Sequence, residues 1–536
     1  MLQFTVDGQQ VEVPDDGSSL LEVLRDRLGL RSAKDGCSPQ GQCGCCTVWI
    51  DGHPRVACVT PCRRVAGRSV TTIDGLDHER RDRWARAFTD AGASQCGFCT
   101  PGIVMRLAAS EMKAEAAGGA PPDEAALSMA LAAHLCRCTG WRSIFDAAAS
   151  AMGAGAAGQR APRDLEAAAR RAALEGGTPQ QVGEAVALGR GGFADDEAPL
   201  DALVAVPDAI GGWAVADTLH EARAAAGKVQ GRRSTVALRH PLELPPGSFE
   251  LTLRTTFVEP AYLEPDASWC VPGGEPAGPL ANGGAFGGKQ TSVVGVTARR
   301  LADHHGRPVR VVMAREDVVR LGPKRPPIAA GVRGDGTGVL RVARTPRSGD
   351  LGAWRRAVAA AAPGFTVEEV EVAGPPVSAD IRTAGWAEAT VLLAALEARS
   401  SGRVGPGSEV TVMSAEGGRA AASVAGDGSV SVSVAGGEVL DEVVLRSYVL
   451  GAVHQALGWV RREALSVDEE GQVLDLTIRS FGVISARDMP PVEVEVDHAG
   501  GPPVRVGDAV FAAVATAAWL ASGLGPAWPV ERGGPR

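Results

Sequence analysis

The sequence predicts a multidomain α+β protein in which a small sheet domain, a helical domain and a mixed α/β region follow one another. Its length of 536 residues corresponds to roughly three or four domains at about 150 residues each. Ten of the eleven cysteines lie before residue 140, whereas Cys270 stands alone. An Ala-, Gly- and Arg-rich stretch follows these cysteines, and strand and helix patterns alternate in the rest of the chain.

The charge balance and the N-terminal sequence limit the classes of partner and the compartment that we expect. A net charge of -9 without long blocks of one sign disfavours a nucleic-acid footprint and a polybasic membrane anchor, which leaves small molecules and proteins. The N-terminus enters a strand pattern without a secretory signal, so we expect a cytoplasmic, reducing setting. The charge-free run 509–530 could span a membrane by length, but glycines and prolines interrupt it, and a buried helix ending near Gly523 is favoured.

Residues 1–75 are expected to form a β-grasp domain of the ferredoxin type. Apolar and polar residues alternate over 2–6 and 10–13, on either side of the hairpin signal Asp7-Gly8. Ser19 then opens an amphipathic helix. Two strands, a helix and a following cysteine loop predict this fold.

The first cysteine group combines three thiols in one loop with a fourth from farther along the chain. These four are Cys37, Cys43, Cys46 and Cys58. The loop spacing is C-x5-C-x2-C, one residue longer than the plant-type C-x4-C-x2-C loop, and its glycines allow close approach of backbone N–H groups to an iron–sulfur cluster. Cys45 and Cys62 have no place among the four, and we expect them to be small buried side chains.

The second cysteine group offers four more thiols, and we expect it in a helical-bundle domain over 76–155. These four are Cys96, Cys99, Cys136 and Cys138. Thr100-Pro101 predicts the start of a helix that runs to Ala116, and Thr139 is a candidate cap for a second helix over 141–152. Both cysteine pairs would then lie at helix N-termini, where the dipole stabilises thiolates and the negative charge of a cluster.

Two other roles for these cysteines are open at this point. Four thiols are also a tetrahedral zinc set, although C-x2-C followed some 36 residues later by C-x-C fits common zinc ribbons poorly. A disulfide framework would need an oxidising compartment and would leave an odd thiol.

A linker over 156–180, with a short helix at 163–174, is expected to lead into a mixed α/β region at 181–536. Its first elements are predicted at 200–206 and 212–216 as strands and at 218–227 as a helix. A helix at 292–304 with Gly306 as its C-cap precedes a strand at 308–313.

The segments GCSPQGQCGCCTV, QCGFCTPG and LCRCTGW resemble the two-cluster iron–sulfur module of the molybdenum hydroxylases, the family of xanthine dehydrogenase, aldehyde oxidase and aerobic carbon monoxide dehydrogenase. The resemblance covers residues 1–155. It implies that each group of four cysteines binds one 2Fe-2S cluster, and that Gln95 touches a molybdopterin. His134 stands where the family has Asn, and Trp141 where it has Tyr.

The glycine-rich segment 281–290, ANGGAFGGKQ, has two interpretations. A phosphate-binding P-loop would use Lys289, but Gln290 replaces the magnesium-binding Ser or Thr and no apolar strand precedes the loop. The segment also resembles the GGxFGGK loop of the family's large subunit. That resemblance implies cofactor contacts from Gly283, Gly284, Phe286, Gly287 and Gly288. Residues 377–397 resemble the family segment that carries a substrate-side arginine, here Arg382.

The region after the linker also departs from the family. It is much shorter than a complete molybdopterin module, and Gly501 stands where the family has a glutamate in a GEPP motif. Hydroxylation needs a general base, which glycine cannot supply. Glu493, Glu495 and His498 are nearby substitutes, although alternating Val and Glu is typical of a strand with one solvated face.

We therefore expect an iron–sulfur oxidoreductase of the xanthine dehydrogenase type that relays electrons between a molybdopterin site and an external acceptor. The chain has no G-x-G-x-x-G fingerprint after a strand, so the acceptor is expected to be a separate flavin subunit or carrier. Binding of molybdopterin and of a small-molecule substrate is an open expectation. In the alternative, the C-terminal region docks a catalytic molybdopterin partner and the chain is a noncatalytic electron-transfer or assembly subunit. A zinc-stabilised interaction protein is a third hypothesis.

Overall fold

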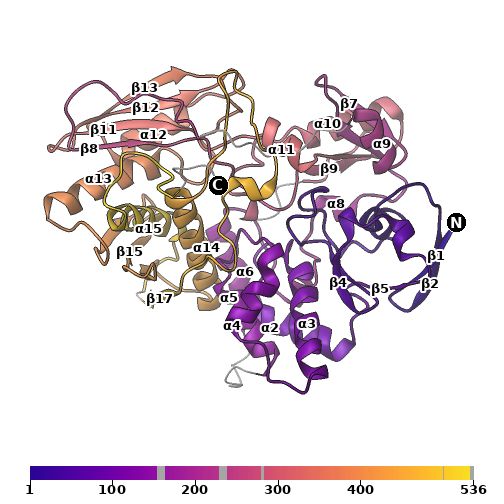
Figure 1. Cartoon of the computed structure of the whole chain (residues 1–536). Helices are drawn as coiled ribbons and strands as arrows, with labels where there is room; N and C mark the ends of the chain where they lie inside the picture. The colour runs from indigo at the N-terminus through magenta and orange to yellow at the C-terminus, as the bar shows by residue number, and fades with distance from the viewer. Residues whose placement is uncertain (154–162, 228–237, 279–282, 499, 532–536) are drawn as a thin grey trace.

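A computed structural model describes residues 1–153, 163–227, 238–278, 283–498 and 500–531. In Figure 1 the first sheet and helices α2 to α5 lie together, and the C-terminal helices α14 and α15 lie against a second body that carries two further sheets. A smaller sheet with α9 and α10 lies beside the N-terminal domain. The predicted multidomain α+β architecture is confirmed.

The N-terminal domain is a five-stranded sheet in the order β2-β1-β5-β3-β4. The strands are β1 Leu2–Val6, β2 Gln9–Val13, β3 Thr47–Ile50, β4 His53–Val56 and β5 Ser69–Thr71. Helix α1, Leu20–Glu22, begins with the predicted capping box, in which Ser19 and Glu22 bond each other's backbone, and it continues as a wider turn over Val23–Arg27. The hairpin, the helix and the cysteine loop occur in the order that the sequence predicts.

The second domain is helical. Its helices are α2 His78–Asp90, α3 Thr100–Ala116, α4 Glu124–Ala130 and α5 Arg142–Ala151. The predicted start at Thr100-Pro101 is confirmed, with Cys99 at the N-cap position. The predicted cap at Thr139 is wrong, because α5 begins after Trp141 and has no side-chain cap. The Thr139 hydroxyl lies 3.1 Å from Cys136 Sγ instead, so the cysteine loop uses the hydroxyl that a helix cap would have used.

The rest of the chain contains three four-stranded sheets, ordered β7-β6-β10-β9, β13-β12-β11-β8 and β14-β15-β16-β17. Their strands are β6 Leu203–Pro207, β7 Trp213–Ala216, β8 Leu251–Arg254, β9 Ala267–Cys270, β10 Val309–Val312, β11 Ile328–Val332, β12 Gly338–Arg344, β13 Phe365–Glu371, β14 Val410–Met413, β15 Arg419–Val424, β16 Val430–Ala435 and β17 Val492–Asp497. The predicted strands at 200–206, 212–216 and 308–313 correspond to β6, β7 and β10.

Helices of varied length pack on these sheets. They are α6 Leu165–Gly176, α7 Glu184–Ala187, α8 Ala194–Glu197, α9 Leu219–Ala226, α10 Val294–His305, α11 Arg315–Leu321, α12 Gly352–Ala361, α13 Trp386–Ser400, α14 Glu442–Arg461 and α15 Gly507–Ala521. Short 3-10 segments lie at Ala57–Val59, Cys62–Val65, Leu131–Ala133, Gly283–Ala285 and Ile478–Phe481. Helix α10 ends at Gly306 in the left-handed conformation, as the sequence predicts. Part of the expected linker, 156–162, lies outside the described residues.

Helix α15 is the apolar segment that the sequence predicts to be buried, and it ends at Ala521. It packs against α13 and α14, with Phe511 stacked on Trp459 at 5.3 Å between ring centroids. In the part of the chain that the structure describes, no helix combines the length and apolarity that a bilayer crossing requires.

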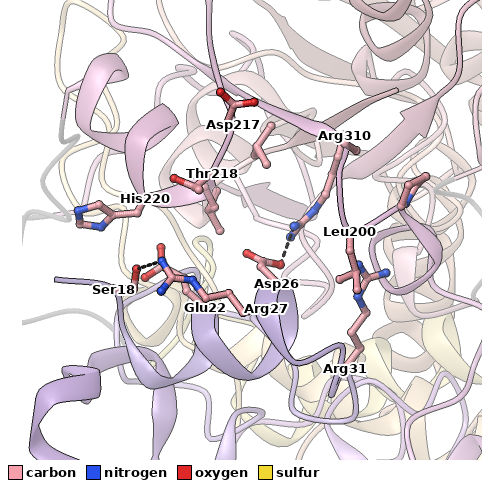
Figure 2. A pocket seen from close by; sticks show the side chains of 14 residues that line it. Ser18, Glu22, Asp26, Arg27, Arg31, Leu200, Asp217, Thr218, His220 and Arg310 are labelled. Atoms are coloured by element: carbon pink, nitrogen blue, oxygen red, sulfur yellow. Dashed lines mark hydrogen bonds and ion pairs between the residues drawn. The ribbon is translucent and has the colours of Figure 1, made fainter. Parts of the chain in front are cut away.

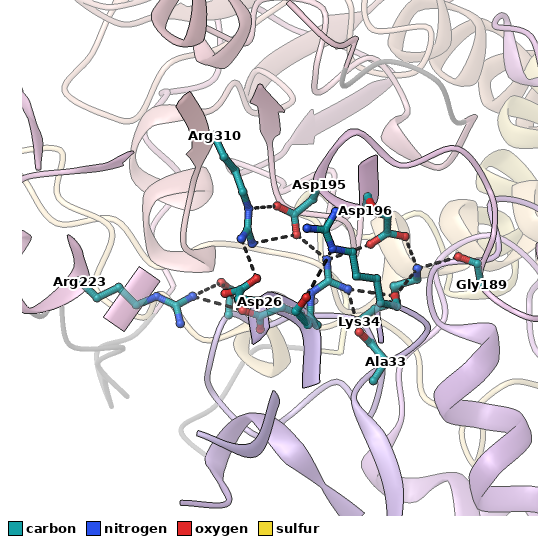
Figure 3. A network of polar contacts seen from close by, with 12 residues as sticks. Asp26, Ala33, Lys34, Gly189, Asp195, Asp196, Arg223 and Arg310 are labelled. Atoms are coloured by element: carbon teal, nitrogen blue, oxygen red, sulfur yellow. Dashed lines mark hydrogen bonds and ion pairs between the residues drawn. The ribbon is translucent and has the colours of Figure 1, made fainter. Parts of the chain in front are cut away.

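A buried network of ion pairs joins the N-terminal domain to the segment that leads into β6. Asp195 accepts bonds from Arg25 at 2.6 Å and from Arg310 at 2.6 Å, and Asp196 pairs with Arg25 and Lys34. Figure 3 shows Arg310 of β10 reaching both Asp195 and Asp26. Burial alone would raise the pKa of Asp195, but the charges of Arg310 and Arg25 outweigh it and hold that pKa well below its usual range.

A small cavity of about 100 Å³ lies beside this network, between the first helix and the start of α9. Figure 2 shows Asp26 and Arg310 joined on one side of the cavity and Thr218 and His220 on the other. Both acidic and basic side chains line the cavity. The cavity lies between the two domains, next to the ion pairs that connect them.

We predict that Asp195→Asn lowers the free energy of unfolding by about 3 kcal/mol, because the two buried guanidinium groups that Asp195 pairs with lose one of their negative partners. Asp196 and Asp26 still face these groups. Chemical denaturation at pH 7 measures this loss. The matched control is Asp217→Asn, which breaks an exposed pair with Arg307 and should cost at most about 1 kcal/mol. Equal losses in the two variants would contradict the structural role of the network.

Candidate functional site

The first four predicted thiols lie together beneath the N-terminal sheet, and we call them the outer group: Cys37, Cys43, Cys46 and Cys58. All four are buried, with at most 4% of each residue exposed. The thiols of Cys43 and Cys58 donate hydrogen bonds to Cys37 and lower its pKa well below the usual value. Cys58 also contacts Cys46. Sulfur atoms from residues 37 to 58 thus meet at one point, as the sequence predicts.

Backbone N–H groups point at the outer group. The amides of Gln40 and Gln42 donate to Cys37 Sγ at 3.3 and 3.4 Å. Such bonds stabilise a thiolate and are one of the means by which proteins set the reduction potential of an iron–sulfur cluster. The loop thus supplies both the sulfurs and the donors that an anionic cluster requires.

The second four predicted thiols form the inner group: Cys96, Cys99, Cys136 and Cys138. Cys138 Sγ lies 3.7 Å from Cys96 Sγ, and Cys99 donates a hydrogen bond that lowers the pKa of Cys136 to about 6. Cys99 is the N-cap residue of α3, as expected. The prediction for the other pair is wrong, because Cys136 and Cys138 lie in the loop ahead of α5 rather than at its first turn.

The thiols of the inner group meet in two pairs, whereas those of the outer group form a chain of contacts from Cys43 through Cys37 and Cys58 to Cys46. In the inner group Cys96 contacts Cys138 and Cys99 contacts Cys136. Two close pairs fit a binuclear iron–sulfur cluster, in which each iron takes two cysteine sulfurs, better than they fit a single zinc ion. Within the described ranges, no set of three or more His, Cys, Asp or Glu side chains has a geometry that could hold a single metal ion.

The two groups are in direct backbone contact. The amide of Leu135, next to the inner ligand candidate Cys136, donates to the carbonyl of Cys43 in the outer group at 3.0 Å. A Cβ atom at Gly102 would lie 2.2 Å from the carbonyl of Gly44, so only glycine lets the first turn of α3 reach the outer loop. One hydrogen bond therefore links the two thiol groups.

Two other buried side chains fill the space between the groups. Cys45 is fully buried, and its thiol contacts Cys43, in agreement with the expected small buried side chain. His134 bonds the Thr47 hydroxyl at 3.2 Å, and burial together with the charge of Arg106 lowers its pKa to about 3. His134 is therefore neutral at pH 7 and adds no charge between the groups.

The C-terminal region holds the inner loop through a buried ion pair. Arg137, between Cys136 and Cys138, forms a bidentate pair with Glu463 at 2.5 and 2.7 Å, and at most 6% of either side chain is exposed. Helix α14 also lies directly on this loop at Gly451, where a Cβ atom would approach the Cys138 carbonyl to 2.0 Å.

A cavity of about 270 Å³ opens next to the inner group and brings together several predicted residues. Gln95, Phe286, Gly287 and Arg382 line it together with Cys138. Gly283, Gly284 and Gly288 belong to the same glycine loop but do not line the cavity, and residues 281 and 282 of that loop lie outside the described residues.

Close packing contacts, rather than backbone amides that face the cavity, determine the shape of the glycine loop. A Cβ atom at Gly287 would lie 1.7 Å from the Asp380 carbonyl, and one at Gly288 would strike the ring of Tyr262 at 2.5 Å. The Gly288 amide donates to Ala285 within the loop. The ammonium group of Lys289 is buried against Glu264 at 2.6 Å, so the P-loop interpretation, which needs this lysine to face a phosphate, is wrong.

Arg382 presents a buried positive charge to the cavity. Its guanidinium lies over the ring of Phe286 at 5.3 Å and bonds the Gln455 side chain, and among the described residues its Nε has no hydrogen-bond partner. Burial lowers the pKa of Arg382 to about 10, and the charge of Asp508 opposes this effect, so the side chain is charged at pH 7. Gln95 donates its amide to the Cys138 carbonyl at 2.8 Å and connects the cavity wall to the inner group.

The suggested replacement bases lie away from the cavity. Glu493 and Glu495 point to solvent from β17, His498 pairs with exposed Glu442, and Gly501 is exposed. Two acidic residues do line the cavity, Asp380 and Glu175 of α6.

Sequence reasoning missed Glu175. Its carboxylate pairs with Arg171 at 2.5 Å and accepts the amides of Val506 and Gly507. Burial raises its pKa, and Arg171 opposes the rise. No local pattern identifies such a residue, because the two amides that donate to its carboxylate lie more than 300 residues away along the chain. Arg505, which also lines the cavity, was missed for the same reason.

Comparisons with known proteins agree with this arrangement. Residues 4–63 match the 2Fe-2S iron-sulfur cluster binding domain, and residues 72–149 match the [2Fe-2S] binding domain. Isoquinoline 1-oxidoreductase subunit alpha of Brevundimonas diminuta is 40% identical over 147 residues, which are 27% of this chain and 92% of that protein. A probable xanthine dehydrogenase subunit of Bacillus subtilis (strain 168) is 37% identical over 27% of this chain and 82% of its own length.

Solved structures extend the likeness in fold to the C-terminal region. The aldehyde oxidoreductase from Desulfovibrio gigas matches with a TM-score of 0.68 at 14% identity, covering 97% of each chain. The aldehyde oxidoreductase from Desulfovibrio desulfuricans ATCC 27774 matches with a TM-score of 0.64 at 15% identity, again over 97% of each.

We predict that Cys138→Ser reduces the iron and acid-labile sulfide content from about four of each per chain to about two, because only the inner group loses a ligand. Anaerobic metal and sulfide analysis, with absorbance spectra, measures the change. Cys270→Ser is the matched control, since Cys270 is a buried thiol outside both groups, and it should leave about four. Loss of neither cluster in Cys138→Ser would refute the assignment.

Gly451→Ala should destabilise the docking of α14 on the inner loop by about 1–3 kcal/mol, because the added methyl group meets a backbone carbonyl that cannot swing aside. Thermal unfolding and the retention of the inner cluster measure this effect. Gly349→Ala is the control, because nothing lies within 4 Å of a Cβ atom there. Equal behaviour of the two variants would contradict the close packing.

Proposed function

The chain belongs to the molybdenum hydroxylase family, and from that premise we propose that it is an oxidoreductase of the xanthine dehydrogenase type that passes electrons through two 2Fe-2S clusters in series. In this proposal the outer group of thiols holds the ferredoxin-like cluster and the inner group holds the cluster next to the cavity. The domain boundaries are those of the sequence: 1–75, 76–155, a linker at 156–180 and 181–536.

The observation that carries the proposal is the series of contacts from the cavity through the inner group to the outer group. Cys138 lines the cavity, the Leu135–Cys43 hydrogen bond joins the two groups, and Val59, next to Cys58, is 50% exposed. Electrons that leave the cavity therefore have a short route through the protein to the surface near Val59. A separate flavin subunit or electron carrier is the proposed acceptor there.

The cavity has the donors for an anionic cofactor. Gln95, Arg382 and Arg505 line it, and in the part of the chain that the structure describes Arg382 Nε has no hydrogen-bond partner. A molybdopterin bound here would supply the two-electron oxidation of a small-molecule substrate, while Gln95 and Arg382 would orient it beside Cys138. At about 270 Å³ the cavity is just below the roughly 300–1,000 Å³ common for small-molecule sites, so the fit is limited to a compact group.

One observation favours a second candidate function, in which the chain is a noncatalytic electron-transfer or assembly subunit. Gly501 supplies no base, and Glu175, one of two acidic residues that line the cavity, is engaged by Arg171 and two amides. In this case a partner chain would carry the molybdopterin. Relatives named as subunits, such as the nicotinate dehydrogenase small FeS subunit of Eubacterium barkeri, support a multi-subunit assembly, for which we propose a cytoplasmic setting.

Metal and pterin analysis of the purified chain tests the two candidates together. Iron with stoichiometric molybdenum and pterin is the result expected if the cavity holds the cofactor. Iron without molybdenum would favour the noncatalytic candidate, with the chemistry on a partner. A chain that binds zinc and no iron would overturn both.

A further inference from the structure

Arg315, the first residue of α11, is a fully buried arginine that binds the loop of the outer group. Its Nε and Nη2 donate to the carbonyl of Gly36 at 3.2 and 2.8 Å, and Nη2 also donates to the carbonyl of Leu263 at 2.9 Å. None of its side chain is exposed. A guanidinium from the C-terminal region therefore lies inside the wall of the outer thiol group.

Gly36 places this charge close to the sulfur atoms. It directly precedes Cys37, and a Cβ atom at Gly36 would lie 3.1 Å from both Cys43 Sγ and Cys45 Sγ. The bonded carbonyl therefore belongs to the peptide between Gly36 and Cys37, and Gly36 also lies against the thiol of Cys43. A charge held on this peptide acts on the outer group at short range.

The charge of Arg315 is not neutralised by a direct ion pair. Among the described residues its guanidinium donates to backbone carbonyls alone, its Nη1 has no hydrogen-bond partner, and the adjacent Glu316 feels its charge without pairing with it. Arg137 at the inner loop differs, because Glu463 neutralises it through two bonds. Arg223, which reaches the outer loop from α9, is likewise paired with Asp35.

We propose that Arg315 is a positioning residue that raises the reduction potential of the outer cluster and so makes that cluster the electron acceptor of the pair. Reduction adds one negative charge to the cluster, and a nearby positive charge that no direct ion pair neutralises stabilises the reduced form, more strongly inside a protein than in water. At the inner loop Glu463 neutralises Arg137, so that arginine contributes no comparable bias. This inference rests on the proposed function, since it presumes a cluster at the outer group.

The next residue of α11 allows a test in the opposite direction. Glu316 accepts a hydrogen bond from the Gln40 side chain at 2.9 Å, and the backbone N–H of Gln40 donates to Cys37 Sγ. Removal of the Glu316 charge by Glu316→Gln should favour the reduced cluster, whereas removal of the Arg315 charge should disfavour it. Two adjacent substitutions that shift the potential in opposite directions are not the result of general loosening of the loop.

The experiment is a potentiometric titration at pH 8 of the full chain, in which electron paramagnetic resonance separates the two clusters. Arg315→Gln should lower the midpoint potential of the outer cluster by more than it lowers that of the inner cluster. In Arg315→Lys, which keeps the charge, the midpoint potential of the outer cluster should lie between that of the original chain and that of Arg315→Gln. The control Arg347→Gln changes an exposed arginine and should shift neither midpoint.

The outcomes separate this inference from the proposed function. Absence of both clusters from the original chain would refute the proposed function itself. If both clusters form and Arg315→Gln leaves the outer midpoint unchanged or shifts both midpoints equally, only the role of Arg315 is refuted. If Arg315→Gln fails to assemble the outer cluster, Glu316→Gln decides: a rise in the outer midpoint supports the inference, and no rise refutes it.

Discussion

The buried ion pair between Arg137 and Glu463 determines how the two halves of the molecule fit together. Arg137 lies between two inner thiols, and Glu463 follows α14, so one pair connects the inner loop to the helix that forms a wall of the cavity. Breaking such a pair from one side leaves an uncompensated buried charge, which is why its geometry is strongly constrained. The close contact of Gly451 with Cys138 and the place of Gln95 depend on this docking.

This docking also assigns the C-terminal region a structural role that does not require catalysis. It covers the inner loop through Arg137 and binds the outer loop through Arg315, so the electrostatics of both clusters depend on residues far away in the chain. Because both regions belong to one chain, each copy of the cluster module has these contacts.

Local patterns predicted much of the fold and the whole set of eight thiols. The hairpin, the capping box at Ser19, the start of α3 and the pair α10–β10 follow from short stretches whose hydrogen bonds close within the stretch. Thr139 failed as a cap because its hydroxyl bonds Cys136 within the same short motif. Lys289 failed as a phosphate ligand because it pairs with Glu264, which the glycine loop does not contain. Glu175 was missed because α6 and the start of α15 meet only in the folded chain.

The central claim is that this chain holds two 2Fe-2S clusters in one rigid series. Electron paramagnetic resonance of the chemically reduced chain tests it most directly. The account predicts two distinct signals, each of about one unpaired electron per chain. A single signal, or none in a chain that is folded and loaded with metal, would contradict it.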